Sequence, residues 1–441
     1  MDRFNELRDK YSTFVYKDYS IEIVEGKCLV KYLFEIPGLT EFHPSWEFPV
    51  YRDYDKDILE RLVFSLGMVE AISYYKCTCA PVIKIECGKL SNQQKEWWIK
   101  LFYHGLGEFM YINGIDISKE KLLRIECEEG DDNPLTDRMT YDGCLIPVGG
   151  GKDSVVSMEL LKNEKAATYH INYPSAIREV VEAYEAGEYD YHAVRRLCSN
   201  MLELNKQGFL NGHTPFSAIV AFSSVIAALL SGKKYITLSN ENSANETTVK
   251  DSFVNHQYSK SYEFEKDFEW YFNTLTDSDI HYFSLLRPLA EIQIAALFAK
   301  FNSYHKIFRS CNVGSKTGIW CCDCPKCLFV YIILCPFLSE EEMVGIFGEK
   351  LLDKPSLMED FKKLTGILTD KPFECVGTRK EVMVALKAYV LNGGSSLMTD
   401  SYKEVILNEQ DNLISMLKSW NEEHNVPTHY ADMVKRSMGI E

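Results

Sequence analysis

The stretch CLIPVGGGKDSVVSMELL, residues 144–161, decides the fold. It joins a short apolar run, typical of a buried β-strand, to a helical pattern whose apolar face includes Val155, Val156 and Met158. Three glycines separate the two elements, and glycine allows positive φ angles and close approach of the backbone to a ligand. A strand, a glycine turn and a helix direct free backbone N–H groups and the positive end of the helix dipole toward an anion. The stretch therefore predicts a phosphate-binding loop in a parallel α/β sheet.

Two common phosphate-binding motifs do not match this loop. The Walker A motif needs a glycine where the chain has Ile146, and a serine or threonine where it has Asp153. The dinucleotide motif G-x-G-x-x-G fails because Ser154 occupies its last glycine position. The loop instead resembles the S-G-G-x-D-S pyrophosphate loop of the ATP-pyrophosphatase (PP-loop) superfamily. Members of that superfamily cut ATP between the α and β phosphates, transfer AMP to an oxygen of the substrate and release pyrophosphate.

This resemblance implies a set of nucleotide ligands. The residues that it implies for ATP binding are Gly149, Gly150, Gly151, Lys152, Asp153 and Ser154. Asp153 is the residue implied for holding Mg²⁺. The chain departs from the motif at Gly149, which replaces a serine and so removes one hydroxyl donor, and Pro147 lies in the strand, where proline cannot donate to a β-ladder. A glycine turn without a ligand is the alternative interpretation.

The rest of the chain divides into three predicted regions. With 441 residues it is long enough for about two or three domains. Residues 1–136 mix strand-like and helical runs and predict a smaller α+β domain, followed by an acidic linker at 128–138. In residues 137–338 short apolar strands alternate with helices, which predicts an α/β, PP-loop (adenine nucleotide alpha hydrolase-like) domain with a parallel sheet. Residues 339–441 predict a helical region with an exposed C-terminal tail.

Composition excludes several classes of function. The formal net charge of −16 repels polyphosphate backbones, so nucleic acid is not an expected partner. No window holds 18 uninterrupted apolar residues, and the charged start of the chain lacks a signal-peptide core, so no membrane partner is expected. Fourteen cysteines in such a chain indicate thiols or metal ligands in a reducing compartment, which predicts a cytoplasmic protein. No feature of the sequence points to a particular oligomeric state.

Five cysteines cluster between residues 311 and 327. Four of them, in the frame C-x9-C-x2-C-x2-C, are Cys311, Cys321, Cys324 and Cys327. Four thiolates close a tetrahedral Zn²⁺ site with no open position, so the metal is expected to be structural and to contribute on the order of 10 kcal/mol. The adjacent Cys322 is expected to be spare, since the spacing from 321 to 324 makes a regular knuckle. Buried cysteines without a metal are the alternative.

Two further segments concentrate polar groups that are costly to bury without a ligand. One follows the end of an apolar strand, where open α/β sheets bind ligands, and adds Ser239, Asn240 and Glu241 to the predicted ATP site. The other includes the residues VNHQYSKS, and the fixed charge of an arginine further along suits a carboxylate or phosphate. The predicted substrate-binding residues are Asn255, Gln257, Ser259 and Arg287. Ordinary loops and caps are the alternative for these segments.

Several segments together resemble one enzyme family. GLGEFMYINGI, PVGGGKDSVVSMELLK, SNENSANE, VNHQYSKSYEFE and WCCDCPKCLFVYIIL look like the UDP-N-acetylmuramoyl-L-alanyl-L-glutamate epimerases of peptidoglycan synthesis, from about residue 15 to 385. The cysteine frame also resembles the zinc site of 7-cyano-7-deazaguanine synthase, another PP-loop enzyme. The resemblance implies a small-molecule substrate, a UDP-sugar dipeptide, whose terminal L-glutamate is inverted with ATP and Mg²⁺ and release of AMP and pyrophosphate.

The chemistry of such an inversion explains why ATP is needed. An α-proton beside a carboxylate is barely acidic, because its removal builds a second negative charge, and adenylation removes the first charge. The proton transfer needs groups within hydrogen-bond reach of Cα, and the candidates on residue type are His256, Tyr258 and Lys260. In the N-terminal domain, Trp97 and Trp98 are candidates for stacking on the sugar nucleotide, although most aromatics of this domain are expected in the hydrophobic core. The competing hypotheses are another PP-loop ligase or modifying enzyme, and a zinc-containing binding protein without activity.

Overall fold

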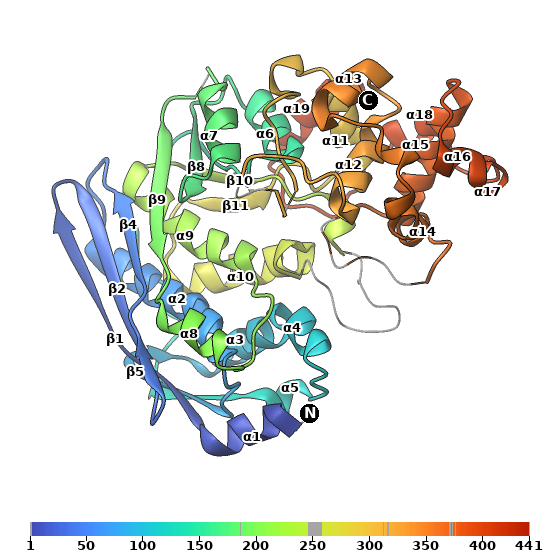
Figure 1. Cartoon of the computed structure of the whole chain (residues 1–441). Coiled ribbons are helices and arrows are strands. Elements are labelled where there is room, and N and C mark those ends of the chain that lie inside the picture. The colour runs from blue at the N-terminus through green and yellow to red at the C-terminus, as the bar shows by residue number, and fades with distance from the viewer. Residues whose placement is uncertain are drawn as a thin grey trace. The chain divides into compact units, whose positions relative to one another are not determined.

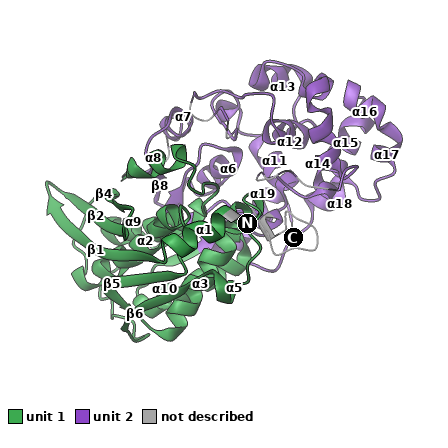
Figure 2. Cartoon of the chain, turned by 60° about the horizontal axis from the view of Figure 1, so that its bottom comes forward, with its two compact units in different colours: residues 1–143, 191–236, 253–282 green, residues 144–190, 237–252, 283–441 purple. Residues whose placement is uncertain are grey.

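The structure is a computed structural model of the chain, and it confirms the α/β class. It describes residues 2–185, 187–245, 258–311, 313–314, 317–369, 372, 374 and 376–440. Two compact units are present (Figure 2): unit 1 comprises residues 1–143, 191–236 and 253–282, and unit 2 comprises residues 144–190, 237–252 and 283–441. The predicted division at 136/137 and 338/339 stays a prediction.

Unit 1 is built on a mixed β-sheet with the strand order β9-β4-β2-β1-β5-β6 and with β3 beside β2 (Figure 1). The strands are β1 (Thr13–Val24), β2 (Lys27–Ile36), β3 (Thr40–Phe42), β4 (Ser45–Pro49), β5 (Val82–Leu90), β6 (Arg124–Glu129) and β9 (Asp190–Arg196). β1 pairs antiparallel with β2 and parallel with β5, which pairs parallel with β6. Along β2, buried and more exposed residues alternate, as expected for a strand with one face against the core.

Helices bury one side of this sheet. They are α1 (Asp2–Lys10), α2 (Lys56–Tyr75), α3 (Asn92–Gly105), α4 (Gly107–Ile112), α5 (Lys119–Leu122), α8 (Asn200–Lys206), α9 (Phe216–Ser231) and α10 (Tyr262–Leu275), with a 3-10 turn η2 (Tyr258–Lys260). The helical runs predicted within residues 1–136 include α2 and α3. The Asp55 side chain caps α2, and Ser91 with Gln94 forms a capping box on α3.

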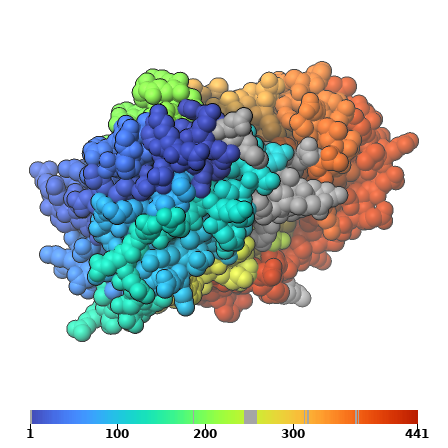
Figure 3. Space-filling view, turned by 90° about the horizontal axis from the view of Figure 1, so that it is seen from below, coloured from blue at the N-terminus to red at the C-terminus, as the bar shows by residue number. Residues whose placement is uncertain are grey.

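The N-terminal helix is held by backbone acceptors of its own unit. Arg8 of α1 donates to the carbonyl oxygens of Lys121 and Leu122 at 3.0 and 2.7 Å. Figure 3 shows this face, with the dark-blue residues of α1 beside cyan residues near position 120. Arg8 thereby satisfies carbonyl groups at the end of α5 that the helix itself leaves unpaired.

The two tryptophans named as candidates for stacking on the substrate lie in the core of unit 1, which is the alternative that the sequence favoured. Trp97 is 8% exposed and Trp98 is fully buried. Trp97 stacks on Tyr271 with ring centroids 4.5 Å apart, and Trp98 stacks on Phe222 at 5.1 Å. Each indole N–H already donates, to Asp267 O and to the Tyr271 hydroxyl. Both rings therefore serve packing.

A buried ion pair links α2 to β9 inside unit 1. The Glu70 side chain is fully buried and accepts two hydrogen bonds of 2.9 Å from Arg195, whose side chain is 9% exposed. Trp46 donates a third bond to the same carboxylate at 3.2 Å. Such a pair is bidentate and well satisfied, which is the arrangement in which a buried carboxylate is tolerated.

Glu70→Ala is expected to lower the free energy of unfolding by about 3–5 kcal/mol, because it removes the counter-charge of a buried guanidinium. Urea titration followed by tryptophan fluorescence measures this. The matched control is Glu86→Ala, which breaks an exposed pair with Lys84 (side chains 41% and 52% exposed) and is expected to change stability by less than about 1 kcal/mol. Equal effects of the two substitutions would contradict the assignment.

Unit 2 contains the strands that carry the glycine loop. They are β7 (Cys144–Pro147) and β8 (Ala166–Ile171), with the C-terminal ends of β10 (Tyr235–Leu238) and β11 (His281–Ser284). β7 and β8 pair in parallel and are almost continuously buried, so both faces of the sheet are covered, as predicted for βαβ units. Pro147 is the last residue of β7, and the next residue, Val148, continues the ladder by donating to Tyr169 O at 2.8 Å. The proline therefore fits the strand at its end.

The remaining elements of unit 2 are helical. They are α6 (Lys152–Leu160), α7 (Ser175–Glu182), η1 (Asn242–Asn245), α11 (Glu291–Phe298), η3 (Asn302–Tyr304), α12 (Pro325–Leu334), α13 (Glu340–Phe347), η4 (Leu351–Asp353), η5 (Pro355–Leu357), α14 (Met358–Thr365), α15 (Arg379–Leu391), α16 (Leu397–Ser401), α17 (Lys403–Leu407), α18 (Leu413–Leu417) and α19 (Thr428–Met438). The helical prediction for the region after residue 339 is confirmed.

The expected exposure of the C-terminal tail is wrong for α19. Tyr430 is 2% exposed and Val434 is fully buried. The Tyr430 hydroxyl lies 3.0 Å from the Cys144 sulfur, and its ring contacts Phe283 with centroids 5.8 Å apart. The last helix therefore belongs to the core of unit 2. Among the described helices, none is both long and apolar enough to cross a membrane.

Candidate active site

The glycine loop between β7 and α6 has a backbone that demands glycine at Gly150. Gly150 has φ +80°, and a Cβ on it would lie 2.8 Å from Ala176 O. A Cβ on Gly151 would lie 2.7 Å from the Ser310 hydroxyl. A Cβ on Gly149, by contrast, would have no described atom within 4 Å. The loop is therefore packed tightly on one side and open beside Gly149.

Helix α6 begins directly after the loop, and its first turn is not closed by a capping side chain in the part of the chain described. Gly151 is the N-cap residue, and no side chain accepts from the first turn. Ser154 does not cap either, since its hydroxyl donates to Gly151 O at 2.9 Å. The N-terminal N–H groups and the positive end of the helix dipole are therefore free to bind an anion.

Lys152 is almost fully buried although it carries a charge. Its side chain is 1% exposed, and its ammonium forms ion pairs with Asp153 and with Glu291, the first residue of α11. Burial lowers the pKa of Lys152, but the two carboxylates outweigh burial and raise this pKa above its usual range. Burial raises the pKa of Glu291, and Lys152 opposes that rise. Lys152 is thus a cation at neutral pH, placed directly after the loop.

The predicted ATP-binding residues that follow β10 lie in unit 2, held by side-chain contacts. The Ser239 hydroxyl lies 2.8 Å from that of Ser157 in α6. Asn240 donates to the Ser284 hydroxyl at 3.1 Å. Glu241 is 6% exposed, and its carboxylate accepts from the Ser243 hydroxyl at 3.0 Å. Ser239 therefore contacts the helix that starts at the glycine loop.

Arg287, predicted to bind substrate, is fully buried in the same unit. It donates to Glu241 O at 2.7 Å and to the Ser284 hydroxyl at 3.3 Å. These contacts fix the backbone of the segment after β10. They give Arg287 a structural task, and its contact with substrate stays a prediction.

The predicted proton-transfer and substrate residues fall partly outside the described residues. Those outside are Asn255, His256 and Gln257. In η2 of unit 1, Tyr258 is 6% exposed and its ring stacks on His104 with centroids 4.9 Å apart, while Ser259 is also 6% exposed. Burial raises the pKa of Tyr258, so its hydroxyl stays protonated at neutral pH. Lys260 ends the same turn and is less buried.

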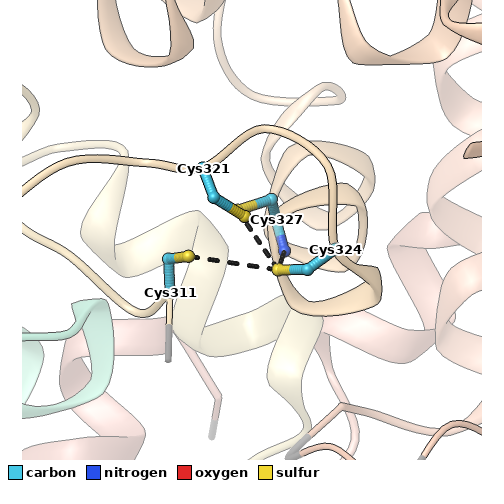
Figure 4. Close-up of side chains that lie close together, drawn as sticks. All are labelled: Cys311, Cys321, Cys324 and Cys327. Atoms are coloured by element: carbon cyan, nitrogen blue, oxygen red, sulfur yellow. Dashed lines mark hydrogen bonds between the residues drawn. The ribbon is translucent and has the colours of Figure 1, made fainter. Parts of the chain in front are cut away.

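The four predicted cysteines come together in unit 2 (Figure 4). The sulfur atoms of Cys311, Cys321, Cys324 and Cys327 all lie within 4.8 Å of one another. The measured separations are 4.0 Å for 311–324, 3.7 Å for 321–327 and 3.5 Å for 324–327. A tetrahedral zinc with Zn–S bonds of about 2.3 Å places its sulfurs about 3.8 Å apart. The cluster therefore has the dimensions of a Cys₄ metal site.

Cys322 is not part of the cluster, as predicted. It has a positive φ of 55°, and its thiol donates to Phe347 O at 3.1 Å. The backbone thus turns one of two adjacent cysteines away from the other four sulfurs. Backbone groups also bind cluster sulfurs: the N–H of Gly314 donates to Cys311, and the N–H of Cys327 donates to Cys324. Backbone donors of this kind stabilise thiolates.

The cysteine cluster is connected directly to the glycine loop. Arg309 N–H donates to Gly150 O at 2.8 Å, and Ser310 contacts Gly151. The next residue is Cys311, a member of the cluster. The side chain of Arg309 also donates to Gly318 O at 2.9 Å, which ties down the chain between Cys311 and Cys321. Residues 309–311 therefore link the position of the loop to the geometry of the four cysteines.

Gly150→Ala is expected to lower the free energy of unfolding by about 2 kcal/mol, because alanine is strained at positive φ and its Cβ meets Ala176 O. Gly149→Ser is the matched control, since this position has space, and it restores the serine of the PP-loop motif; a change of less than about 0.5 kcal/mol is expected. Thermal unfolding of the two variants measures the difference. A tolerated Gly150→Ala would show that the loop is not packed as described.

Sequence reasoning missed the residues that surround Lys152 and the loop from other elements. Glu291 donates its N–H to the Glu381 carboxylate at 2.5 Å, and Glu381 in turn accepts from Thr378. Ser310 lies against Gly151. The sequence does contain one indication of the role of Glu291. It is the isolated glutamate in LLRPLAEIQIAALF, an acidic residue at the start of an otherwise apolar helix.

Two sequence-family models match the chain. The MurL N-terminal domain matches residues 5–285, and the MurL C-terminal domain matches residues 301–400. Together they span both the glycine loop and the cysteine cluster. No solved structure matches the chain.

Three curated relatives bear the same name, UDP-N-acetyl-alpha-D-muramoyl-L-alanyl-L-glutamate epimerase. The one from Xanthomonas oryzae pv. oryzae is 34% identical over 332 residues, which cover 73% of this chain and 72% of the relative. The one from Salinispora tropica is 33% identical over 397 residues, 87% of this chain and 86% of the relative. The one from a Micromonospora species is 33% identical over 399 residues, 87% and 88% of the two chains.

Proposed function

Since the chain belongs to the MurL family of UDP-N-acetyl-alpha-D-muramoyl-L-alanyl-L-glutamate epimerases, we propose that it inverts the terminal L-glutamate of this UDP-muramoyl dipeptide to D-glutamate, at the expense of ATP. The reaction supplies a peptidoglycan precursor in the cytoplasm. The observation that carries the ATP dependence is the glycine loop before α6, an uncapped helix N-terminus with a buried cation at its first residue.

The proposed reaction has three steps. First, an oxygen of the substrate α-carboxylate attacks the α-phosphorus of ATP, the bond between the α-phosphorus and the bridging oxygen breaks, and pyrophosphate leaves with that electron pair. Second, a base takes the Cα proton and a proton returns on the opposite face. Third, water cleaves the acyl-adenylate to give AMP and the inverted carboxylate. Adenylation is the large energetic contribution, since each decade of rate needs about 1.4 kcal/mol and no single hydrogen bond supplies enough.

The residues of the loop have separate tasks in the first step. The N–H groups at the start of α6 and the Lys152 ammonium bind the departing pyrophosphate, where negative charge develops. Gly149 leaves the space through which the nucleotide approaches. Ser239 and Asn240 are assigned to the nucleotide as well, because Ser239 contacts α6.

Asp153 fits a Mg²⁺ ligand. Its side chain is 28% exposed, so a carboxylate oxygen reaches solvent at the loop, and Mg²⁺ is commonly held by one or two carboxylates together with substrate phosphates. Bound there, Mg²⁺ neutralises charge on the phosphates. We assign Asp153 to this ion and the four cysteines to a structural Zn²⁺, which their sulfur separations fit.

For the proton transfer, His256, Tyr258 and Lys260 stay the proposed groups. Burial raises the pKa of Tyr258 and keeps its hydroxyl neutral, so its protonation state is defined. A neutral hydroxyl returns a proton to a carbanion more readily than it removes one. We therefore assign the return of the proton to Tyr258 and its removal to one of the other two residues.

Recognition of the sugar nucleotide is assigned to the N-terminal region, residues 1–136. Unit 1 contains a cavity of about 300 Å³. Its lining includes the rings of Tyr19, Phe64 and Tyr271 together with the guanidinium of Arg61. The lining also includes Glu60, Lys89, Gln94 and Asp131, so aromatic residues lie beside several polar groups that can orient a small molecule.

The test is incubation of the protein with ATP, Mg²⁺ and the UDP-muramoyl L-Ala-L-Glu substrate. The products are hydrolysed and the glutamate is analysed on a chiral column, while nucleotides are separated by ion exchange. D-Glutamate together with stoichiometric AMP and pyrophosphate is expected. ADP and orthophosphate would contradict the proposal. AMP with unchanged L-glutamate would instead favour a PP-loop ligase, and no turnover of ATP with this substrate would favour a binding protein.

A further inference from the structure

We propose that Glu291 is a positioning residue that keeps the Lys152 ammonium in place at the start of α6, so that an arriving polyphosphate displaces Asp153 from Lys152 while the Lys152–Glu291 pair persists. The inference rests on the proposed function, because it takes ATP as the polyphosphate. Glu291 itself touches neither nucleotide nor substrate in this scheme and acts through Lys152.

The two carboxylates paired with Lys152 differ sharply in burial. The Glu291 side chain is 2% exposed, whereas the Asp153 side chain is 28% exposed. A ligand that approaches from solvent therefore meets Asp153 first. Of the two ion pairs, only the one with Asp153 is open to exchange for a phosphate oxygen.

Glu291 is also fixed by its surroundings on the buried side. Its N–H donates to Glu381 at 2.5 Å, and Glu381 accepts from both the N–H and the hydroxyl of Thr378 at 2.7 Å. A Cβ on Gly377 would lie 3.1 Å from Glu291 Cγ and 3.0 Å from the Glu381 carboxylate. The chain from α15 thus encloses Glu291 at close range and leaves its carboxylate little freedom to leave Lys152.

A buried ammonium needs a partner of opposite charge. The Lys152 side chain is 1% exposed, and its ion-pair partners in the described part of the chain are Asp153 and Glu291. When Asp153 binds Mg²⁺ in place of Lys152, Glu291 is the carboxylate that still pairs with Lys152.

The test is the dissociation constant of MgATP measured by titration calorimetry, without turnover. Glu291→Gln is expected to raise this constant about tenfold or more, the usual effect of removing one charged hydrogen-bond partner. Glu291→Asp keeps the charge and is expected to recover most of the affinity. The control is Glu359→Gln, which alters an exposed i,i+4 pair with Lys363 in α14 and is expected to leave the constant unchanged.

A double-mutant cycle with Lys152→Met separates positioning from direct contact. In the Lys152→Met background, Glu291→Gln is expected to cause no further loss of MgATP affinity, because Glu291 acts on the nucleotide through the Lys152 ammonium, which this background lacks. A further loss there, or an unchanged constant for Glu291→Gln alone, overturns the inference and leaves the proposed function standing. If Lys152→Met does not fold, the comparison of Glu291→Gln with Glu291→Asp decides, and equal losses overturn it. Wild-type protein that binds no MgATP overturns the proposed function itself.

Discussion

Lys152→Met is expected to lower kcat/KM for stereoinversion by about 10²–10³-fold, because it removes the cation that we propose binds the leaving pyrophosphate. Lys152 stands at the first residue of α6, directly after the glycine loop, and is held charged by Asp153 and Glu291. A loss of this size appears in the rate of AMP formation as well as in the rate of D-glutamate formation, since both follow from the same adenylation step. Paired assays of the two products on one reaction mixture provide the measurement.

The control for this substitution is Lys162→Met, beyond the end of the same helix. The Lys162 side chain is 52% exposed and contacts Glu159 at 3.8 Å, so its replacement is expected to leave both rates unchanged. Because Lys152→Met strips the buried Glu291 and the partly exposed Asp153 of their counter-charge, its fold is checked by circular dichroism, and the double variant Lys152→Met/Glu291→Gln removes the buried unpaired charge. Folded Lys152→Met protein with wild-type rates of both products contradicts the assignment.

Cys324→Ser is expected to lower the midpoint of thermal unfolding by about 10 °C or more, because it opens the proposed zinc site, and structural zinc contributes on the order of 10 kcal/mol. The substitution is also expected to weaken MgATP binding, since residues 309–311 join the cluster to the backbone of Gly150 and Gly151. Differential scanning calorimetry, metal analysis by plasma mass spectrometry and nucleotide titration give the three readouts. Removal of the metal from wild-type protein with a chelator is expected to reproduce both effects.

The neighbouring cysteine supplies a matched control. Cys322 adjoins Cys321 in the sequence, but its thiol donates to Phe347 O, a bond that a serine hydroxyl can also make. Cys322→Ser is therefore expected to retain the metal, the thermal midpoint and the nucleotide affinity. If the two variants behave alike, or if purified protein contains no zinc, the four cysteines are buried thiols and the metal assignment fails.

The features that sequence predicted well are those encoded within short segments. The glycine loop lies in six consecutive residues. The spacing of the cysteines from 321 to 327 keeps three of the four sulfurs close together along the chain. Both patterns can therefore be recognised before the fold is known. Strict local spacing also identified Cys322 as spare. Membership of the epimerase family, inferred from segments scattered between residues 15 and 385, is confirmed by the family models and the curated relatives.

The features that sequence did not predict depend on contacts between distant residues. Glu291 is 139 residues from Lys152, and Glu381 lies 90 residues further along, so their convergence depends on how α11 packs on α6 and α15 packs on α11. The last helix was expected to be exposed because its sequence is mostly polar. The apolar residues Tyr430 and Val434 are nevertheless enough to bury one face of α19. Trp97 and Trp98 were ambiguous for the opposite reason, because an aromatic pair suits a core as well as a ligand site.

The most direct test of the central claim, that ATP activates the acid before the Cα–H bond breaks, is solvent deuterium exchange at that carbon. The UDP-muramoyl dipeptide is incubated with the protein in D₂O, and the glutamate is examined by mass spectrometry and proton NMR. With MgATP, one deuteron at Cα of the D-glutamate product is predicted. Without ATP, or with an analogue that has a methylene between the α and β phosphorus atoms, no exchange is predicted. Exchange at Cα in the absence of a cleavable nucleotide would contradict the account.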